Sequence, residues 1–305
     1  MAAETLLWRA LTPGDAPALT RSYAAVEAVD RTGDHYSEQD VRDELADGDT
    51  MAAVADDEEI IAFARVQGAE PVRVEGAVLP ASRGRGLGRR LLEWAEGRAA
   101  SLQARTVRID VHENNPSKQA LARAAGYEAV RWEYRMTRTW DEPLPEVPAS
   151  PPGLAPAPYA ADFDEAVRLA HGEAFADHWG ATPPDEQRWS HSYTGMRAFR
   201  PDISWLVLDD GEVAAYVLSY FWEADRAATG VREAFVGQLG VRPAWRRRGL
   251  GGLLLATALH SYRSAGYERA VLTVDTANAT GALGLYERAG FAVKDTSVTW
   301  VKPLA

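Results

Sequence analysis

A segment rich in arginine and glycine occurs twice in this chain, and this repetition constrains the fold more than any other feature. The first copy, RGRGLG, runs from Arg83 to Gly88, and the second, RRRGLG, runs from Arg246 to Gly251. Each copy follows an apolar run that ends in proline, and each leads into a leucine-rich pattern with helical spacing. The offset between the copies is 246 − 83 = 163 residues. We therefore predict that one unit of strand, turn and helix is repeated.

The predicted turns place free backbone N–H groups at the start of a helix. Such groups have no intrahelical partner, and the positive end of the helix dipole favours a phosphate there. Glycine lets phosphate oxygens approach the backbone, and arginine adds charge and forked donors. Neither copy is followed by Gly-Lys-Ser/Thr, and neither has the G-x-G-x-x-G spacing, so a nucleotide P-loop and a dinucleotide fold are excluded. We expect a ligand that carries a pyrophosphate.

The residues after each turn extend the repeat. After the second copy come Asn278, Leu285-Tyr286-Glu287 and Gly290-Phe291, and after the first come Asn114 and Gly126-Tyr127. With the turns, these residues resemble the GNAT superfamily of N-acetyltransferases, whose acetyl-coenzyme A signature is Arg/Gln-x-x-Gly-x-Gly/Ala between a strand and a helix. The chain is similar to two such domains in tandem, the layout of the mycothiol synthases. The resemblance implies an α/β (α+β) fold with a mixed, mostly antiparallel sheet flanked by helices in each domain.

The resemblance also implies that acetyl-coenzyme A is the cofactor and that it binds along a strand end, the turn and the next loop. In the second copy the implied binding residues are Leu239, Gly240, Val241, Arg246, Arg247, Arg248, Gly249, Leu250, Gly251, Gly252, Asn278 and Tyr286. In the first copy they are Val78, Arg83, Gly84, Arg85, Gly86, Leu87, Gly88, Arg89 and Asn114. Duplication disfavours the alternative of a solvated basic turn, although the first loop can also survive as structure alone.

Length and proline content predict the domain organisation. The 305 residues suit two domains of about 150 residues, each large enough for its own core. Seven prolines fall between Asp141 and Pro158, a density that neither a helix nor a central strand tolerates. We predict domains at 1–140 and 159–305, joined by an extended linker at 141–158 that is either a passive spacer or a surface strap.

Hydrophobic periodicity predicts the same plan in both domains. In the first domain we expect helices at 15–29 and 37–45, strands at 51–55, 60–66, 72–79 and 107–111, and a hairpin turn at 56–59. In the second we expect helices at 162–175 and 185–194 and strands at 205–208, 213–221, 234–241 and 270–274.

Composition excludes several classes of partner and site. A net charge of −11 argues against general binding to nucleic acid or an anionic membrane, and no apolar run approaches a membrane span. The chain has no cysteine, which excludes disulfides and a cysteine nucleophile and fits a cytoplasmic protein. The histidines lack close ligand spacing, so no metal is expected.

One difference between the copies indicates which domain is active. Aligning Gly126 with Gly290 places Ala122 opposite Tyr286. In the resembled family, the tyrosine hydroxyl at this position protonates the departing coenzyme A thiolate, and alanine cannot donate that proton. We predict a catalytic C-terminal domain and a catalytically degenerate N-terminal one. The alternative for Tyr286 is an amphipathic core tyrosine.

Two residues are candidates for the general base. An alkyl amine with a pKa near 10 is protonated at pH 7, and its neutral form costs about 4 kcal/mol, so a base or a water relay is useful. Glu233, at the start of the strand before the loop, is the first candidate, and an exposed strand-end carboxylate is its alternative. His178 is the second candidate, and a hydrogen-bonded structural histidine is its alternative. Gln238 could orient a water, and the backbone N–H groups of 239–241 could polarise the thioester carbonyl, as the resemblance implies.

The sequence thus predicts an acyltransferase that moves an acetyl group to a primary amine of a small molecule by direct attack in the C-terminal domain. The acceptor is left open among mycothiol chemistry, amino sugars, amino acids, polyamines and antibiotic amines. A peptide or protein amine is the alternative within the enzyme class. An acetyl-coenzyme A-binding regulatory or structural protein is the alternative outside it. The sequence does not determine the oligomeric state.

Overall fold

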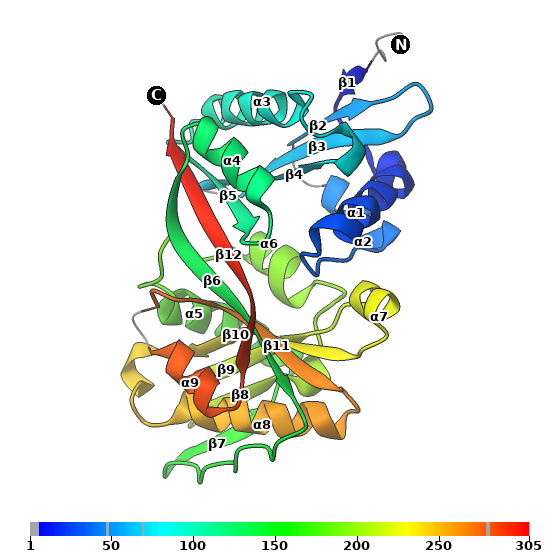
Figure 1. Cartoon of the computed structure of the whole chain (residues 1–305). Coiled ribbons are helices and arrows are strands. Elements are labelled where there is room, and N and C mark those ends of the chain that lie inside the picture. Colours follow the sequence, from blue (N-terminus) through cyan, green and yellow to red (C-terminus); the bar gives the residue numbers. More distant parts are fainter. Residues whose placement is uncertain (1–5, 47–48, 69, 279–280, 305) are drawn as a thin grey trace. The chain divides into compact units, whose positions relative to one another are not determined.

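The computed structural model describes residues 6–46, 49–68, 70–278 and 281–304. The chain forms two compact units (Figure 1). The N-terminal unit consists of Met1–Trp132 and Thr296–Ala305, and the C-terminal unit consists of Glu133–Asp295. None of the helices in the described ranges is both long enough and apolar enough to cross a membrane.

The N-terminal unit is a mixed sheet with helices on both faces. Its strands lie in the order β1 (Leu7–Arg9), β2 (Asp49–Val54), β3 (Ile60–Gln67), β4 (Val72–Val78), β5 (Thr106–His112) and β12 (Ala292–Pro303, of which Thr296–Pro303 belong to this unit). Only the β4–β5 pair of this series is parallel. One core joins the sheet to α1 (Ala16–Asp30) and α2 (Glu38–Ala46), and other cores join it to α3 (Leu87–Ser101) and α4 (Pro116–Ala124).

The C-terminal unit repeats this plan. Its strands lie in the order β6 (Glu128–Thr139, of which Glu133–Thr139 belong to this unit), β11 (Arg269–Asp275), β10 (Glu233–Val241), β9 (Glu212–Tyr220), β8 (Trp205–Asp209) and β7 (Leu154–Pro158), with β10–β11 as the parallel pair. Its helices are α5 (Asp164–Ala174), α6 (Glu186–Trp189), α7 (Glu223–Thr229), α8 (Leu250–Ser264) and α9 (Ala282–Arg288). The predicted fold class is confirmed: both sheets are mixed, mostly antiparallel and flanked by helices.

The two units exchange their last strands. In the C-terminal unit, β6 pairs with β11 from Glu133↔Asp275 to Thr139↔Arg269. In the N-terminal unit, β12 pairs with β5 from Ser297↔His112 to Pro303↔Thr106. Each sheet is therefore completed by a strand from the other repeat. The compact units divide the chain differently from the contiguous boundaries 1–140 and 159–305, because hydrogen bonding between strands does not follow sequence order.

The predicted helices and strands agree with the structure to within a few residues, except for the helix expected at 185–194. The hairpin at 56–59 is present, with the Glu58 N–H donating to the Ala55 carbonyl at 3.0 Å. The helix expected at 185–194 ends as an α-helix at Trp189 and continues as a π-helical turn, Ser190–Thr194. The predicted ranges did not include helices α4, α7 and α9 or strands β1, β6, β7 and β12.

The proline-rich segment is attached to the C-terminal unit. Its last residues form β7, an edge strand that pairs with β8. An edge strand tolerates Pro156 and Pro158 because N–H groups on its outer side donate to no neighbouring strand. At its start, the Trp140 indole N–H donates to the Tyr267 carbonyl at 2.6 Å, and Arg138 donates to the Pro143 carbonyl at 2.7 Å. Both ends of the segment are therefore attached to the C-terminal unit, and the role of 141–158 as a spacer or a strap between the domains stays a prediction.

The packing of strand β12 in the N-terminal core can be tested by a change in stability. Trp300 of β12 is 5% exposed and packs with the β5 core of the N-terminal unit. Trp300→Ala should cost about 3–5 kcal/mol of unfolding free energy because it leaves a cavity in that core. Amide hydrogen exchange should accelerate in β5 and stay unchanged in β9. Trp179→Ala, at a position that is 40% exposed, is the matched control. Unchanged exchange in β5 would contradict the assignment of β12 to the N-terminal core.

Candidate active site

The parallel strand pair of each unit separates toward its carboxyl end. The β10–β11 ladder runs from Glu233↔Arg269 to Val236↔Leu272, although β10 continues to Val241. A β-bulge between Val236 and Gln238 lies where the separation begins. In the N-terminal unit the β4–β5 ladder holds only two residue pairs. The backbone of 239–241, paired on one edge with β9, thus turns its other edge toward the gap in the ladder.

A glycine in the left-handed conformation begins the helix after each parallel strand. Gly249 caps α8 with φ 80°, and Gly86 caps α3 with φ 82°. A Cβ atom built on either glycine meets no atom within 4 Å, so this side of the helix N-terminus is open. Arg247 (φ 63°) adopts the left-handed conformation that Gly84 (φ 76°) has in the first copy. An open, glycine-lined helix start fits a phosphate group.

The last glycine of each motif serves helix packing. A Cβ on Gly251 would lie 3.4 Å from Leu285 Cδ2 of α9, and one on Gly88 would lie 2.9 Å from Leu121 Cδ2 of α4. These glycines therefore let the following helix approach closely. This contact brings α9 next to the start of α8. Close approach of a phosphate at Gly88 and Gly251 stays a prediction.

The first arginine of each motif binds the protein itself. Arg246 Nε donates to the Val241 carbonyl at 3.2 Å, and its guanidinium also reaches the Ala174 carbonyl at 3.0 Å. Arg83 Nε likewise donates to the Val78 carbonyl at 3.1 Å. Both Arg83 Nη atoms bind the carboxylate of Asp30 at 2.8 Å. These arginines tie the turn to the strand end and to the first helix of the repeat, and the phosphate contact expected of them stays a prediction.

The remaining cofactor candidates are distributed around the same turns. Leu250 and Leu87 are buried, whereas Arg247 and Arg248 in the second copy and Arg85 and Arg89 in the first are exposed. An exposed guanidinium at a helix start can bind a phosphate. Asn278 follows β11, where its N–H donates to the Asp275 carbonyl at 3.1 Å.

Asn115, the neighbour of the predicted Asn114, makes side-chain hydrogen bonds after β5. Its side chain accepts from the Lys118 N–H at 2.9 Å, capping α4, and donates to Asp30 at 2.9 Å. Asn114 is exposed, and its N–H donates to His112 Nδ1 at 3.3 Å. The offset of 163 already links Asn115 to residue 278, so this signal was present in the sequence.

Tyr286 lies on α9 with its side chain largely buried. It is 8% exposed, its ring meets Phe291 edge-on at 6.0 Å, and burial raises its pKa to about 12. Its carbonyl accepts from the Phe291 N–H at 3.0 Å, and the Ala122 carbonyl accepts from the Tyr127 N–H at the same distance. Tyr286 and Ala122 therefore occupy equivalent positions in the two units.

The two base candidates lie in different surroundings. Half-buried His178 lies near Arg246 and the carboxylate of Asp275, and its pKa is lowered chiefly by burial. Glu233 lies at the opposite end of β10, about 20 Å along the strand from Leu239 at ~3.3 Å per residue. Its carboxylate pairs with Arg269 and lies 3.9 Å from Arg135 Nη2. The turn, α9 and His178 are thus brought together, and Glu233 is held apart from them.

Sequence reasoning missed a buried polar pair on the α5 side of β9. The Tyr216 hydroxyl lies 2.7 Å from His171 Nδ1, and both side chains are buried. Helical spacing was the available signal, because His171 falls on the buried face of α5 with Val167, Ala170 and Ala174.

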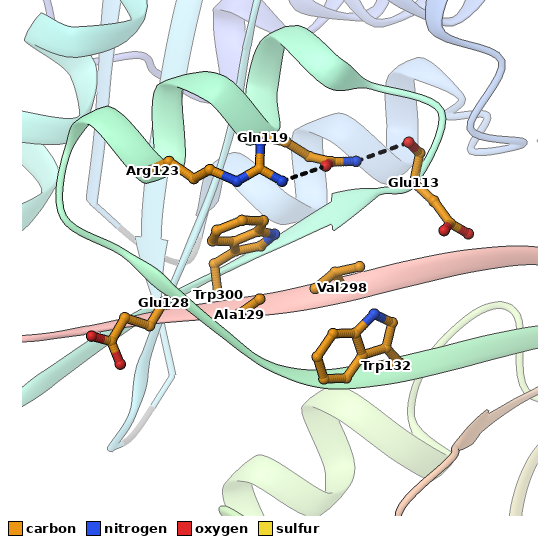
Figure 2. A pocket seen from close by; sticks show the side chains of 8 residues that line it. All are labelled: Glu113, Gln119, Arg123, Glu128, Ala129, Trp132, Val298 and Trp300. Atoms are coloured by element: carbon orange, nitrogen blue, oxygen red, sulfur yellow. Dashed lines mark hydrogen bonds between the residues drawn. The ribbon is translucent and has the colours of Figure 1, made fainter.

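A separate pocket of about 420 Å³ lies in the N-terminal unit (Figure 2). The guanidinium of Arg123 lies 5.0 Å from the centre of the Trp300 indole and donates to Gln119, whose amide donates to the Glu113 carbonyl. Trp132, Val298 and Ala129 line it as well. It includes none of the predicted site residues. In the described part of the chain, no group of three or more His, Asp or Glu side chains could hold a metal ion.

Comparison with known proteins agrees with this geometry. A model of the Acetyltransferase (GNAT) family matches residues 17–127 and again 165–291. A mycothiol acetyltransferase from Thermobispora bispora is 33% identical over 77% of this chain and 78% of its own length. The mycothiol acetyltransferase from Nocardia farcinica is 29% identical over 97% of each chain. The crystal structure of a GCN5-related N-acetyltransferase from Sphaerobacter thermophilus has a TM-score of 0.75 and 29% identity, covering 98% of this chain and 96% of that one.

The two matches of the family model fall on the two repeats, one on each glycine-rich turn. The chain therefore belongs to the Acetyltransferase (GNAT) family of acyltransferases and carries two copies of its domain in tandem.

Proposed function

We propose that the C-terminal unit transfers the acetyl group of acetyl-coenzyme A to a primary amine of a small molecule. The observation that carries this proposal is the position of Tyr286 on α9, which packs against the open helix start at Gly249–Gly251. The equivalent residue of the N-terminal unit is Ala122, which has no hydroxyl. The N-terminal unit therefore keeps the fold without the acid.

The relatives support a small amine as the acceptor. The relatives described above from Thermobispora bispora and Nocardia farcinica are both named mycothiol acetyltransferase. The second of these aligns over 97% of both chains, so the likeness extends over both repeats of this protein. We therefore place an amine of mycothiol type first among the acceptors for this chain.

The described residues fit coenzyme A as a ligand. The N–H groups at the start of α8, with Arg247 and Arg248, would hold its phosphates, and the free edge of 239–241 would hold the arm that leads to the sulfur. Bound acetyl-coenzyme A supplies the thioester carbonyl that the neutral amine attacks directly. Backbone N–H groups of 239–241 would stabilise the charge that develops on the carbonyl oxygen.

Proton transfers in this proposal use Tyr286 and His178. Tyr286 donates its hydroxyl proton to the departing sulfur, and its raised pKa keeps that proton in place at neutral pH. His178 accepts a proton from the amine, because burial lowers its pKa and keeps the imidazole neutral. Glu233 is engaged by Arg269, which favours a structural role for it.

The glycine-rich turn gives the first test. Gly249→Val forces a β-branched residue to φ 80° and fills the open side of the helix start. Calorimetry should show at least a tenfold loss of coenzyme A affinity, about 1.4 kcal/mol or more. Gly230→Val is the matched control, since Gly230 also has positive φ (73°) and open space around its Cβ but caps α7. Retained affinity in a folded Gly249 variant would refute the site. The same change at Gly86 reports whether the N-terminal unit binds a second molecule.

Removing the Tyr286 hydroxyl tests the general acid. Tyr286→Phe keeps the ring that packs on Phe291, so kcat should fall by about 10²- to 10⁴-fold with little change in melting temperature or coenzyme A affinity. An acid loses activity as pH rises through its pKa. Because that pKa is about 12, wild-type kcat should not decline between about pH 8 and 10 on account of this group. Near-wild-type turnover in the Phe variant would make Tyr286 a packing residue only.

Comparison of His178→Asn with Glu233→Gln tests the base. A base loses activity as pH falls through its pKa, and the pKa of His178 lies below its ordinary value of about 6.5. Wild-type kcat/KM should therefore fall below about pH 6.5, which gives the pH profile an acid limb. His178→Asn should remove this acid limb and lower kcat/KM about 10²-fold. Glu233→Gln should lower the melting temperature and leave the limb in place. The reverse pattern would assign the base to Glu233.

A further inference from the structure

The pair formed by Tyr216 and His171 is placed against the strand that the proposed function uses. Gly240 stands opposite Tyr216 in the β9–β10 ladder. A Cβ on Gly240 would lie 2.5 Å from Tyr216 Cε1 and 2.6 Å from its hydroxyl oxygen. The phenol ring therefore rests directly on the backbone of β10, between Leu239 and Val241. Any side chain at 240 would displace it.

The hydrogen bond to His171 fixes this ring. Tyr216 is fully buried and His171 is 6% exposed, so neither polar group has water as a replacement partner. The imidazole stacks on Phe175 at 4.5 Å and meets Tyr193 edge-on at 5.0 Å, which holds its plane. Burial lowers the pKa of His171 to about 4, so the ring stays neutral at physiological pH.

Helix α5 also holds the glycine-rich turn. Its last residue, Ala174, accepts from Arg246 at 3.0 Å through its carbonyl. His171 lies one turn earlier on the same helix. One rigid element therefore contacts both the turn that would hold the phosphates and, through Tyr216, the strand that would hold the thioester.

The N-terminal unit supplies an internal comparison. Ala77 is the counterpart of Gly240 (240 − 77 = 163), and Phe63 stands opposite Ala77 as Tyr216 stands opposite Gly240. Tyr23 is seven residues into α1 (23 − 16), as His171 is seven residues into α5 (171 − 164). Tyr23 and Phe63 meet edge-on at 4.8 Å. Because phenylalanine has no hydroxyl, the pair in this unit cannot form the corresponding hydrogen bond.

We propose that His171 and Tyr216 are positioning residues for acetyl transfer, which hold the β10 backbone at Gly240 in register with the thioester carbonyl. This inference rests on the proposed function. The hydrogen bond occurs in the unit that has Tyr286 and is impossible in the unit that has Ala122 at the same place. Backbone donors stabilise developing charge only when they are held in place before the reaction, so a strand free to shift would lose kcat.

Tyr216→Phe removes the hydroxyl and keeps the ring on Gly240. We expect kcat to fall about tenfold or more, coenzyme A affinity to stay within about twofold, and amide exchange to accelerate at 239–241. Tyr262→Phe is the matched control, because Tyr262 is equally buried and its hydroxyl lies 2.7 Å from Ser219 Oγ. The control should lose similar stability and keep kcat and exchange at 239–241 unchanged.

A double variant separates positioning of β10 from the general need of buried polar groups for hydrogen-bond partners. His171→Leu with Tyr216→Phe removes both buried polar groups, so the melting temperature should recover relative to Tyr216→Phe alone. If the pair positions β10, kcat stays low in the double variant. Recovery of kcat together with stability would overturn the inference, as would wild-type kcat or lost coenzyme A affinity in Tyr216→Phe.

The exchange measurement separates this inference from the proposed function. A wild-type protein that neither binds coenzyme A nor acetylates any amine would refute the proposed function. Exchange at 239–241 needs no turnover, so it still decides whether the pair holds the strand. Unchanged exchange in Tyr216→Phe overturns the inference even if the wild-type enzyme is active.

Discussion

The early end of the β10–β11 ladder is the constraint on which the rest of the C-terminal unit depends. Parallel strands that stop pairing at Val236 leave backbone groups of β10 without a ladder on that side. Such groups need partners, and a ligand can supply them. The bulge at Gly237 and the left-handed Gly249 both serve this opening, since one bends the strand and the other begins α8 beside it. The same interruption occurs between β4 and β5, so it belongs to the repeated plan.

The two units present different chemistry on the equivalent face of their sheets. In the C-terminal unit this face carries Tyr216 and Tyr220 in an aromatic core. In the N-terminal unit Arg65 is 9% exposed there, 2.7 Å from Glu75 and 3.4 Å from Glu44. Burial raises the pKa of Glu44 to about 7. A buried charge is stable only when it is paired with an opposite charge, so Arg65 and the two carboxylates serve as ion-pair partners for one another. This difference, added to Ala122, favours one reactive unit.

The sequence predicted what depends on local pattern and missed what depends on distant partners. Periodicity found most of the strands and helices, and the motif alignment placed Ala122 opposite Tyr286, because both signals lie within a repeat. The contacts of Arg83 and Arg246 were missed because the acceptors, Asp30 and the Ala174 carbonyl, lie on other elements. The packing role of Gly251 depends on Leu285, which the motif alone does not name.

The strand exchange gives a physical reason for keeping a repeat that has alanine at the position of Tyr286. A contiguous chain of residues 159–305 would lack β6, so β11 would become an unpaired edge carrying buried residues such as Val271 and Leu272. Its own β12 would have no β5 to pair with, and Trp300 would leave its core. Exposed apolar edges of this kind invite aggregation. The C-terminal unit thus needs the sequence of the N-terminal repeat to complete its sheet, whatever the N-terminal repeat binds.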